Sequence, residues 1–141
     1  MRGGIDGSRV LLGGLAAGLI INISETVLNG VVISEKSTAA MQALNLAPVT
    51  GGDIAMYVAM GFALGILLVW LYAAMRPRLG PGPWTAMKAG FVAWFLIYVW
   101  SFVNFTAMGL FPTDLNLIST VWGFFEIMIA SLVGGWVYRE V

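Results

Sequence analysis

The chain has 141 residues, of which 60% are hydrophobic and 10% charged, with a formal net charge of zero and a mean hydropathy of +0.90. Soluble domains carry roughly 25% charged residues, so this composition excludes an ordinary water-soluble fold. Seven Lys and Arg residues in all argue against a nucleic-acid partner. The absence of Cys and His removes disulfides, thiol catalysis, the commonest general base and most transition-metal sites.

Four apolar runs are each long enough to cross a bilayer about 30 Å thick, which takes roughly 20 helical residues. None shows the period-2 alternation of a membrane strand. We therefore predict one all-α domain over residues 1–141, with four transmembrane helices in an antiparallel bundle and a short amphipathic helix in the first outer loop. The predicted spans cover about residues 9–33, 54–75, 86–111 and 115–138.

The three connections differ in composition. The first is the longest, and its residues 37–46 have the pattern of the amphipathic helix, after which Asp53 is expected to cap the second span. The second, residues 76–84, is dense in Pro and Gly and predicts a turn. The third, residues 111–114, is so short that spans three and four must be antiparallel neighbours.

The Lys and Arg residues predict the orientation of the chain in the membrane. With the N-terminus inside, one side collects six of them and the other side only Lys36, so both termini are expected on the cytoplasmic face of a bacterial inner membrane. The six are Arg2, Arg9, Arg76, Arg78, Lys88 and Arg139. Aromatic residues near the same face predict an interfacial belt: Trp70, Tyr72, Trp84, Trp136 and Tyr138.

Small residues recur at helical spacing in several spans and predict close helix packing. Gly14 with Gly18 and Gly61 with Gly65 match the Gly-xxx-Gly pattern, which lets transmembrane helices approach closely. The fourth span carries Gly123 and Gly134 on one stripe with Glu126. These six glycines are our predicted helix-packing residues.

Five polar residues within the spans predict an inward-facing network: Asn22, Glu25, Asn29, Asn104 and Glu126. Counting about 1.5 Å per residue places Asn22 and Glu126 at nearly the same depth, with Glu25 one turn higher. The expected pairs are Asn22 with Glu126, and Glu25 with Asn104 or Asn29.

Two readings of Glu25 and Glu126 remain open, with a ligand or partner contact as a third. A membrane-embedded carboxyl suggests proton or cation handling. Alternatively, two protonated acids tie span one to span four by hydrogen bonds. Two Glu and no His make a poor metal site, since four-helix di-metal proteins use four carboxylates and two His. No catalytic constellation is present, so we expect no enzyme activity.

The third span has aromatic residues all around the helix rather than on one face. Phe91, Trp94, Tyr98, Trp100 and Phe105 are among them. A helix that is apolar all round faces lipid, a partner or both. Without a His ligand, lipids and carotenoid or chlorophyll-type pigments would contact the chain by packing only, and no cofactor is expected to bind through side-chain ligands.

Three segments carry a resemblance to a known family. They are SETVLNG at residues 24–30, WLYA at 70–73 followed by RPRLGPG at 76–82, and WGFFE at 122–126 followed by GWVYR at 135–139. Together they resemble a family of small bacterial four-span integral membrane proteins with no assigned function. The resemblance covers most of the chain and implies a four-span fold, but it carries no functional residue over.

Two functions follow as hypotheses. The first is a non-catalytic accessory subunit of a larger bacterial inner-membrane assembly, such as a photosynthetic reaction-centre, light-harvesting or respiratory complex. Its partners would be other integral membrane subunits and lipids. The second is a small proton-coupled transporter that works as a homodimer. Small multidrug transporters also have four spans and an essential glutamate in the first, but here the acid comes late in that span and Glu126 is additional.

Overall fold

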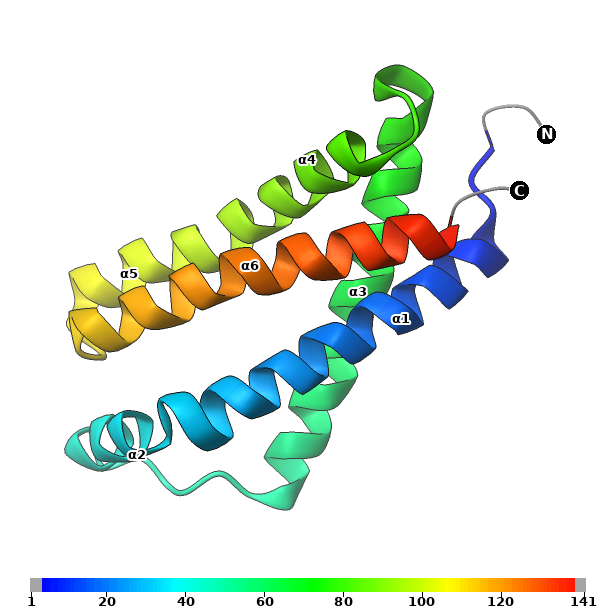
Figure 1. Cartoon of the computed structure of the whole chain (residues 1–141). Coiled ribbons are helices and arrows are strands. Elements are labelled where there is room, and N and C mark those ends of the chain that lie inside the picture. Colours follow the sequence, from blue (N-terminus) through cyan, green and yellow to red (C-terminus); the bar gives the residue numbers. More distant parts are fainter. Residues whose placement is uncertain (1–3, 139–141) are drawn as a thin grey trace.

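The computed structural model describes residues 4–138, and within this range it is all-helical (Figure 1). Four helices are long and apolar enough to cross a membrane: Gly7–Val32, Gly51–Leu79, Pro83–Met108 and Thr113–Tyr138. The predicted all-helical fold with four helices long enough to span a membrane is therefore confirmed, with helix ends that differ by a few residues.

Two of the four spans contain a π-helical turn. The first span consists of α1 (Gly7–Val27) and the π-turn η1 (Leu28–Val32). The third consists of α4 (Pro83–Trp94), the π-turn η2 (Phe95–Val99) and α5 (Trp100–Met108). The second and fourth spans are the uninterrupted helices α3 (Gly51–Leu79) and α6 (Thr113–Tyr138). The short helix α2 (Ser34–Ala43) lies in the first connection, three residues earlier than the predicted segment 37–46.

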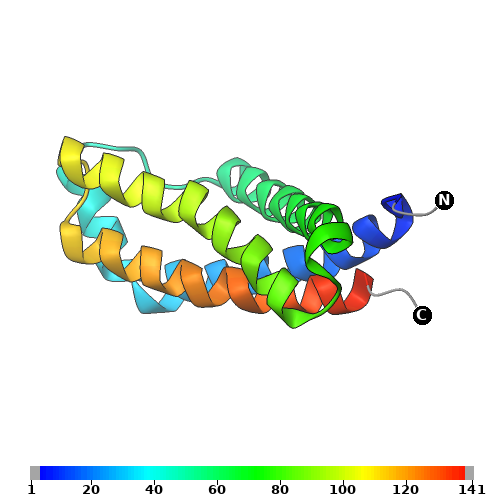
Figure 2. The same ribbon diagram turned by 90° about the horizontal axis from the view of Figure 1, so that it is seen from above.

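Helix α6 lies between α1 and the α4–α5 span, and both of these run opposite to it (Figure 1). Helix α3 crosses α1 and α6 obliquely on their far side in this view. Seen from above, the α4–α5 span passes across α6 at an angle (Figure 2). The first described residues and the end of α6 meet at one end of the molecule, where Asp6 N–H donates to Tyr138 OH at 3.2 Å. We call this the Tyr138 end and the opposite end the α2 end.

Glycines set the close crossing of α1 and α3. A β-carbon on Gly14 would lie 2.5 Å from Ile66 Cα, and one on Gly65 would lie 2.5 Å from Gly14 O and 2.7 Å from Gly18 Cα. The obstacles are backbone atoms, which cannot move aside as a side chain can. On α6, a β-carbon on Gly134 would lie 2.5 Å from Val69 Cγ2 of α3 and 3.2 Å from Gly13 O of α1. These contacts are the ones that small residues permit between membrane helices.

The apolar core has two parts. The larger one fills the crossing of α1, α3, α4 and α6 toward the Tyr138 end, with Ala17, Leu68, Ala89 and Ile127 fully or nearly fully buried. The smaller one lies at the α2 end, where Leu28, Ile33, Ala40 and Leu115 pack together. Helix α2 thus contributes one buried residue and otherwise lies exposed or partly exposed.

Both ends of α3 differ from the prediction. Thr50, not Asp53, is the N-cap residue: Thr50 Oγ1 accepts a hydrogen bond from Asp53 N–H, and the Asp53 carboxylate accepts one from Thr50 N–H. This reciprocal pair is a capping box. At the other end the helix continues through Pro77 to Leu79, because a proline so near the end of a helix sacrifices a single backbone bond. Gly80 then ends it with a φ of 83°.

Ion pairs of charged residues lie at both ends of the molecule. At the α2 end, Lys36 Nζ lies 2.8 Å from Asp114 Oδ2, and both side chains are exposed. At the Tyr138 end, Arg9 lies 3.4 Å from Asp6. Arg2 and Arg139, which the orientation argument also used, lie outside the described residues.

Candidate functional site

The third span widens by one π-turn midway along its length. Residues Phe95–Val99 form η2, which places an extra residue in one turn and rotates the rest of the span relative to a regular helix. Such turns occur frequently at functional sites. The turn carries Tyr98, which contacts α6.

Tyr98 connects the third span to the acid of the fourth. Its hydroxyl donates a hydrogen bond to Glu126 Oε2 at 2.9 Å. Its ring packs on Gly123, one helical turn before Glu126, and a β-carbon on Gly123 would lie 2.5 to 2.7 Å from three ring carbons. Gly123, predicted to permit helix packing, thus makes room for a tyrosine ring.

Glu126 lies beside Glu25 of the first span. The two side chains are close enough for a hydrogen bond between the carboxyl groups. Glu126 is only 3% exposed, and Glu25 is partly buried. Glu25 Oε2 and Glu126 Oε1 are buried and have no hydrogen-bond partner among the described residues while both acids are ionised, since carboxylates only accept.

Two further residues complete the surroundings of the acids. Trp122 Nε1 donates to Ser24 Oγ at 2.9 Å, which ties α6 to α1 one turn from Glu126. The Ser24 hydroxyl lies beside the Glu126 carboxyl. We call Ser24, Glu25, Tyr98, Trp122 and Glu126 the carboxyl site.

No Lys or Arg of the described range neutralises the carboxyl site. The charged group that acts on Glu126 is Glu25, and those that act on Tyr98 are the two glutamates. The cations of residues 4–138 lie near helix ends or on α2, such as Arg9 two residues into α1 and Arg76 three residues before the end of α3. Within the same range, no group of three or more potential metal ligands occurs.

The asparagines of the predicted network lie elsewhere. Asn22 Nδ2 donates to Val58 O of α3 at 3.2 Å, so the expected pairing of Asn22 with Glu126 is absent. Asn22 and Glu25 are three residues apart, which separates their directions by about 60° around a helix. That is enough for Asn22 to face α3 while Glu25 faces α6.

Asn29 and Asn104 are exposed rather than inward-facing. Asn29 Nδ2 donates to the backbone oxygen of Glu25 at 2.9 Å, and Asn104 Nδ2 donates to Trp100 O at 2.8 Å, each within its own span. Asn104 follows η2, whose extra residue turns it away from the direction that regular helical spacing predicts. The carboxyl of Glu25 therefore pairs with Glu126 and with neither asparagine.

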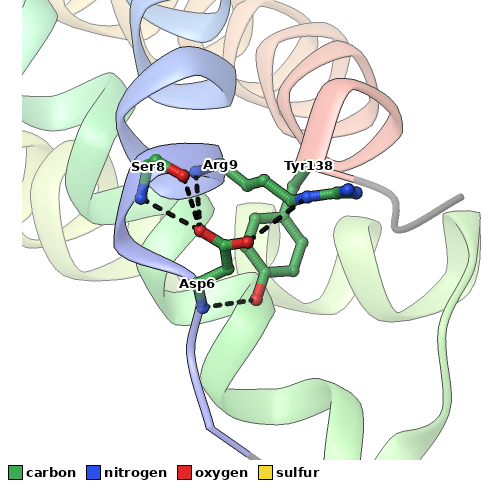
Figure 3. Close-up of polar contacts among 4 residues, drawn as sticks. All are labelled: Asp6, Ser8, Arg9 and Tyr138. Carbon is green, nitrogen blue, oxygen red and sulfur yellow. Dashed lines mark hydrogen bonds and ion pairs between the residues drawn. The ribbon is translucent and has the colours of Figure 1, made fainter. Parts of the chain in front are cut away.

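A second polar cluster joins the helix ends at the Tyr138 end (Figure 3). Asp6 caps α1 by accepting hydrogen bonds from the backbone N–H groups of Ser8 and Arg9. The Ser8 hydroxyl, which donates to Asp6 at 2.7 Å, and the Arg9 N–H hold the pKa of this carboxyl below its usual value. Asp6 N–H donates to the hydroxyl of Tyr138, which fastens the start of α1 to the end of α6.

Tyr72 and Tyr138 correct the predicted interfacial belt. They are 3% and 1% exposed and pack edge to face, with ring centroids 6.1 Å apart. The Arg76 guanidinium lies over both rings, 5.9 Å and 5.3 Å from their centroids. Tyr72 OH also accepts from Gly82 N–H and so holds the Pro/Gly turn. The exposed members of the predicted belt are the three tryptophans Trp70, Trp84 and Trp136.

The sequence predicted the two acids of the carboxyl site but not Ser24, Tyr98 or Trp122. Each of the three is a polar-headed residue within an apolar span, which is a usable signal. Trp122 and Glu126 are also four residues apart on one face of α6. Tyr98 was hidden among the aromatic residues of the third span.

The fold and this site define a class, a four-helix polytopic membrane protein with an uncompensated acid pair between its spans. Comparison with protein-family models, with curated proteins and with solved structures found no match.

Proposed function

We propose that the chain is a non-catalytic accessory subunit of a larger bacterial inner-membrane assembly, which it stabilises by helix packing and by contacts with lipids or pigments. The observation that carries the proposal is the exposure of the second part of the third span, Phe91–Met108. No residue from Phe91 to Met108 is buried, whereas α6 buries ten residues within the same chain. A stretch with no buried residue of its own offers its outward surface to neighbours.

The chemistry of this surface fits large, flat or helical partners. It exposes Phe91, Phe95, Leu96, Trp100 and Val103, with Trp100 at 65%. Aromatic rings provide wide contact area at little conformational cost, and carotenoid or chlorophyll-type pigments would stack on them without a ligand. An energy-transducing complex, with a photosynthetic reaction centre or light-harvesting complex as the leading case, supplies partners of this kind.

Asn104 adds a polar contact to the same surface. Its side chain is exposed and its amide donates to Trp100 O, so its side-chain oxygen faces outward from the span. Polar side chains on membrane helices stabilise helix association by hydrogen bonds across the interface. A neighbouring subunit with a hydroxyl or amide donor would satisfy this oxygen.

The topology that accompanies the proposal is an antiparallel four-helix bundle with both termini in the cytoplasm. The excess of Arg and Lys at the Tyr138 end supports it through the positive-inside rule. Helix α2, with Ala40 packed inward and charged Glu35 and Lys36 exposed, then lies amphipathically at the outer membrane surface.

Native purification tests the proposal. A tagged chain would be extracted from its own membranes in mild detergent, and co-migrating proteins and pigments would be identified by mass spectrometry and absorbance. Stoichiometric co-migration with a large pigmented or haem-containing complex supports the accessory role. Recovery of the chain alone or as a homodimer overturns it.

A second candidate function is proton-coupled transport by a homodimer. The observation that favours it is the acid pair, because ionisable residues within spans commonly mark ion pathways. Under this function Glu25→Gln abolishes transport driven by a proton gradient in liposomes. Under the accessory role the same change affects stability at most.

A further inference from the structure

We infer that Glu25 and Glu126 form an intramembrane proton-binding site in which the two carboxyl groups share a proton. The inference concerns the carboxyl site by itself and holds whether or not the chain belongs to a larger assembly. It rests on geometry, burial and the supply of hydrogen-bond donors, in that order.

The positions of the two carboxyl groups leave room for one proton between them. The Glu25 and Glu126 side chains lie within hydrogen-bond reach of each other from α1 and α6. Each keeps one buried oxygen without a donor among the described residues. Two carboxylates cannot bond to each other, but an acid and a carboxylate can. A proton between them pairs the two groups at once.

The burial of Glu126 favours a proton shared between the two carboxyl groups. Glu126 is only 3% exposed, and its Oε1 atom is buried. An unpaired ionised oxygen in such surroundings is costly because no water can solvate it. Water, which would solvate an exposed pair of carboxylates, therefore does not stabilise the ionised form of Glu126.

The groups that face the pair identify the ligand as a proton rather than a metal ion. From the third span comes Tyr98, whose hydroxyl donates to Glu126 Oε2. From the first span comes Ser24, whose hydroxyl lies beside Glu126 and accepts a hydrogen bond from Trp122 Nε1. Hard cations in proteins require about six or more oxygen ligands, and the described residues hold no cluster of three acidic or metal-binding side chains.

The other titratable groups of the packed elements lie away from the pair. On α1 and α6 they are Arg9, Asp114 and Tyr138, all at or near helix ends. On α3 these groups are grouped toward the helix ends: Asp53, Tyr57, Tyr72, Arg76 and Arg78. On α2 they are Glu35 and Lys36, and Lys36 pairs with Asp114 at the start of α6. On α4 it is Lys88, five residues after the helix start. The carboxyl site therefore changes its charge only by gaining or losing protons of its own.

The Tyr98 hydroxyl gives the acid pair a second stable state. It already donates to Glu126 Oε2, so the carboxylate form of Glu126 keeps this hydrogen bond when the shared proton leaves. Gly123 fixes this arrangement, because the close contact of its backbone with the Tyr98 ring sets the position of the hydroxyl. A site with donors for both states can exchange its proton without local unfolding.

Infrared difference spectroscopy on the purified full-length chain in lipid nanodiscs tests the inference. Spectra would be compared between about pH 6 and about pH 9, where exposed carboxyls are ionised throughout. We expect a carbonyl-stretch band of a protonated carboxyl that shifts in D₂O. Glu25→Gln and Glu126→Gln should each change this band and the double variant should abolish it. The control Asp114→Asn, an exposed acid on α6, should leave it unchanged.

Tyr98→Phe keeps the test decisive if a Gln variant fails to fold. It removes only the hydroxyl and retains the ring against Gly123, so the fold should persist. The band should move to higher frequency, because a carboxyl oxygen loses a hydrogen bond. An unshifted band in Tyr98→Phe, a band unchanged in the double Gln variant, or no protonated carboxyl in the native chain at any of these pH values would overturn the inference.

Discussion

The ring of Tyr98 in the third span occupies the space that a side chain on Gly123 of the fourth would need, with ring carbons 2.5 to 2.7 Å from the position of a β-carbon. The same tyrosine donates its hydroxyl proton to Glu126 Oε2. The packing of two helices and the hydrogen bonding of a buried acid therefore depend on one contact.

Gly123→Ala should disturb both the helix packing and the hydrogen bond to Glu126. The added methyl group forces the Tyr98 ring away from α6, so we expect the hydrogen bond to Glu126 to be lost and the free energy of unfolding to fall by about 1–3 kcal/mol, as for other overpacked sites. Unfolding in mixed detergent micelles, followed by circular dichroism, measures the change. Gly30→Ala is the control, since nothing lies within 4 Å of its β-carbon position. Equal effects of the two changes would contradict this account of Gly123.

Gly65→Ala should separate α1 from α3. The new β-carbon would meet backbone atoms of Gly14 and Gly18, which can yield only if one helix moves. We expect a loss of about 1–3 kcal/mol or more and a longer distance between spin labels placed at the exposed positions Leu15 and Leu67. Gly52→Ala, at the start of the same helix, has only Thr50 Oγ1 near it at 3.7 Å and should change neither quantity. An unchanged label distance in Gly65→Ala would disprove the close crossing.

Asn22→Ala should weaken the same crossing by a smaller amount. It removes the hydrogen bond from Asn22 Nδ2 to Val58 O, a contact class that contributes about 0.6 kcal/mol on average and up to about 1.7 kcal/mol in membrane proteins. Asn104→Ala removes only a bond within its own span and serves as the control for the isolated chain. If Asn22 instead paired with Glu126, Asn22→Ala would alter the infrared band of the carboxyl site, and we expect that band to stay unchanged.

Asp6 should make the start of α1 sensitive to acid. The Ser8 hydroxyl and the Arg9 N–H lower the pKa of the Asp6 carboxyl in the folded chain, so the ionised cap stabilises the fold above the usual aspartate value of about pH 4. This stabilisation is lost as the pH falls through the lowered pKa. Asp6→Asn, which still caps the helix, should remove this part of the pH dependence of the melting temperature. A pH dependence that is the same in both chains would contradict the assignment.

Hydropathy and small-residue spacing were sufficient to predict the four spans and the residues of their close contacts. The number and length of the helices follow from apolar runs that must satisfy their backbone hydrogen bonds internally. Gly14, Gly18, Gly61 and Gly65 lie at the crossing of α1 and α3, where their spacing placed them. Glu25 and Glu126 lie together because both acids have only the bundle interior in which to avoid lipid.

The partners of the polar residues were beyond prediction from helical periodicity. A count of 100° per residue assumes a regular helix, and η2 breaks that count before Asn104. Buried Tyr72 and Tyr138 were expected at the interface because their sequence positions near the span ends are compatible with either location. Their burial comes from the packing of the Tyr72 ring of α3 against the Tyr138 ring of α6, which no local sequence pattern encodes.

The exposed stretch Phe91–Met108 of the third span is the feature on which the proposed function depends, and site-specific photo-crosslinking tests it most directly. A photoreactive phenylalanine analogue would replace Trp100, which is 65% exposed, and separately Leu12 of α1, which is 61% exposed. After illumination of native membranes, the account predicts an adduct with another membrane subunit or a pigment from position 100 and lipid adducts from position 12. Lipid adducts alone from both positions, or an adduct only with a second copy of the chain, would contradict it.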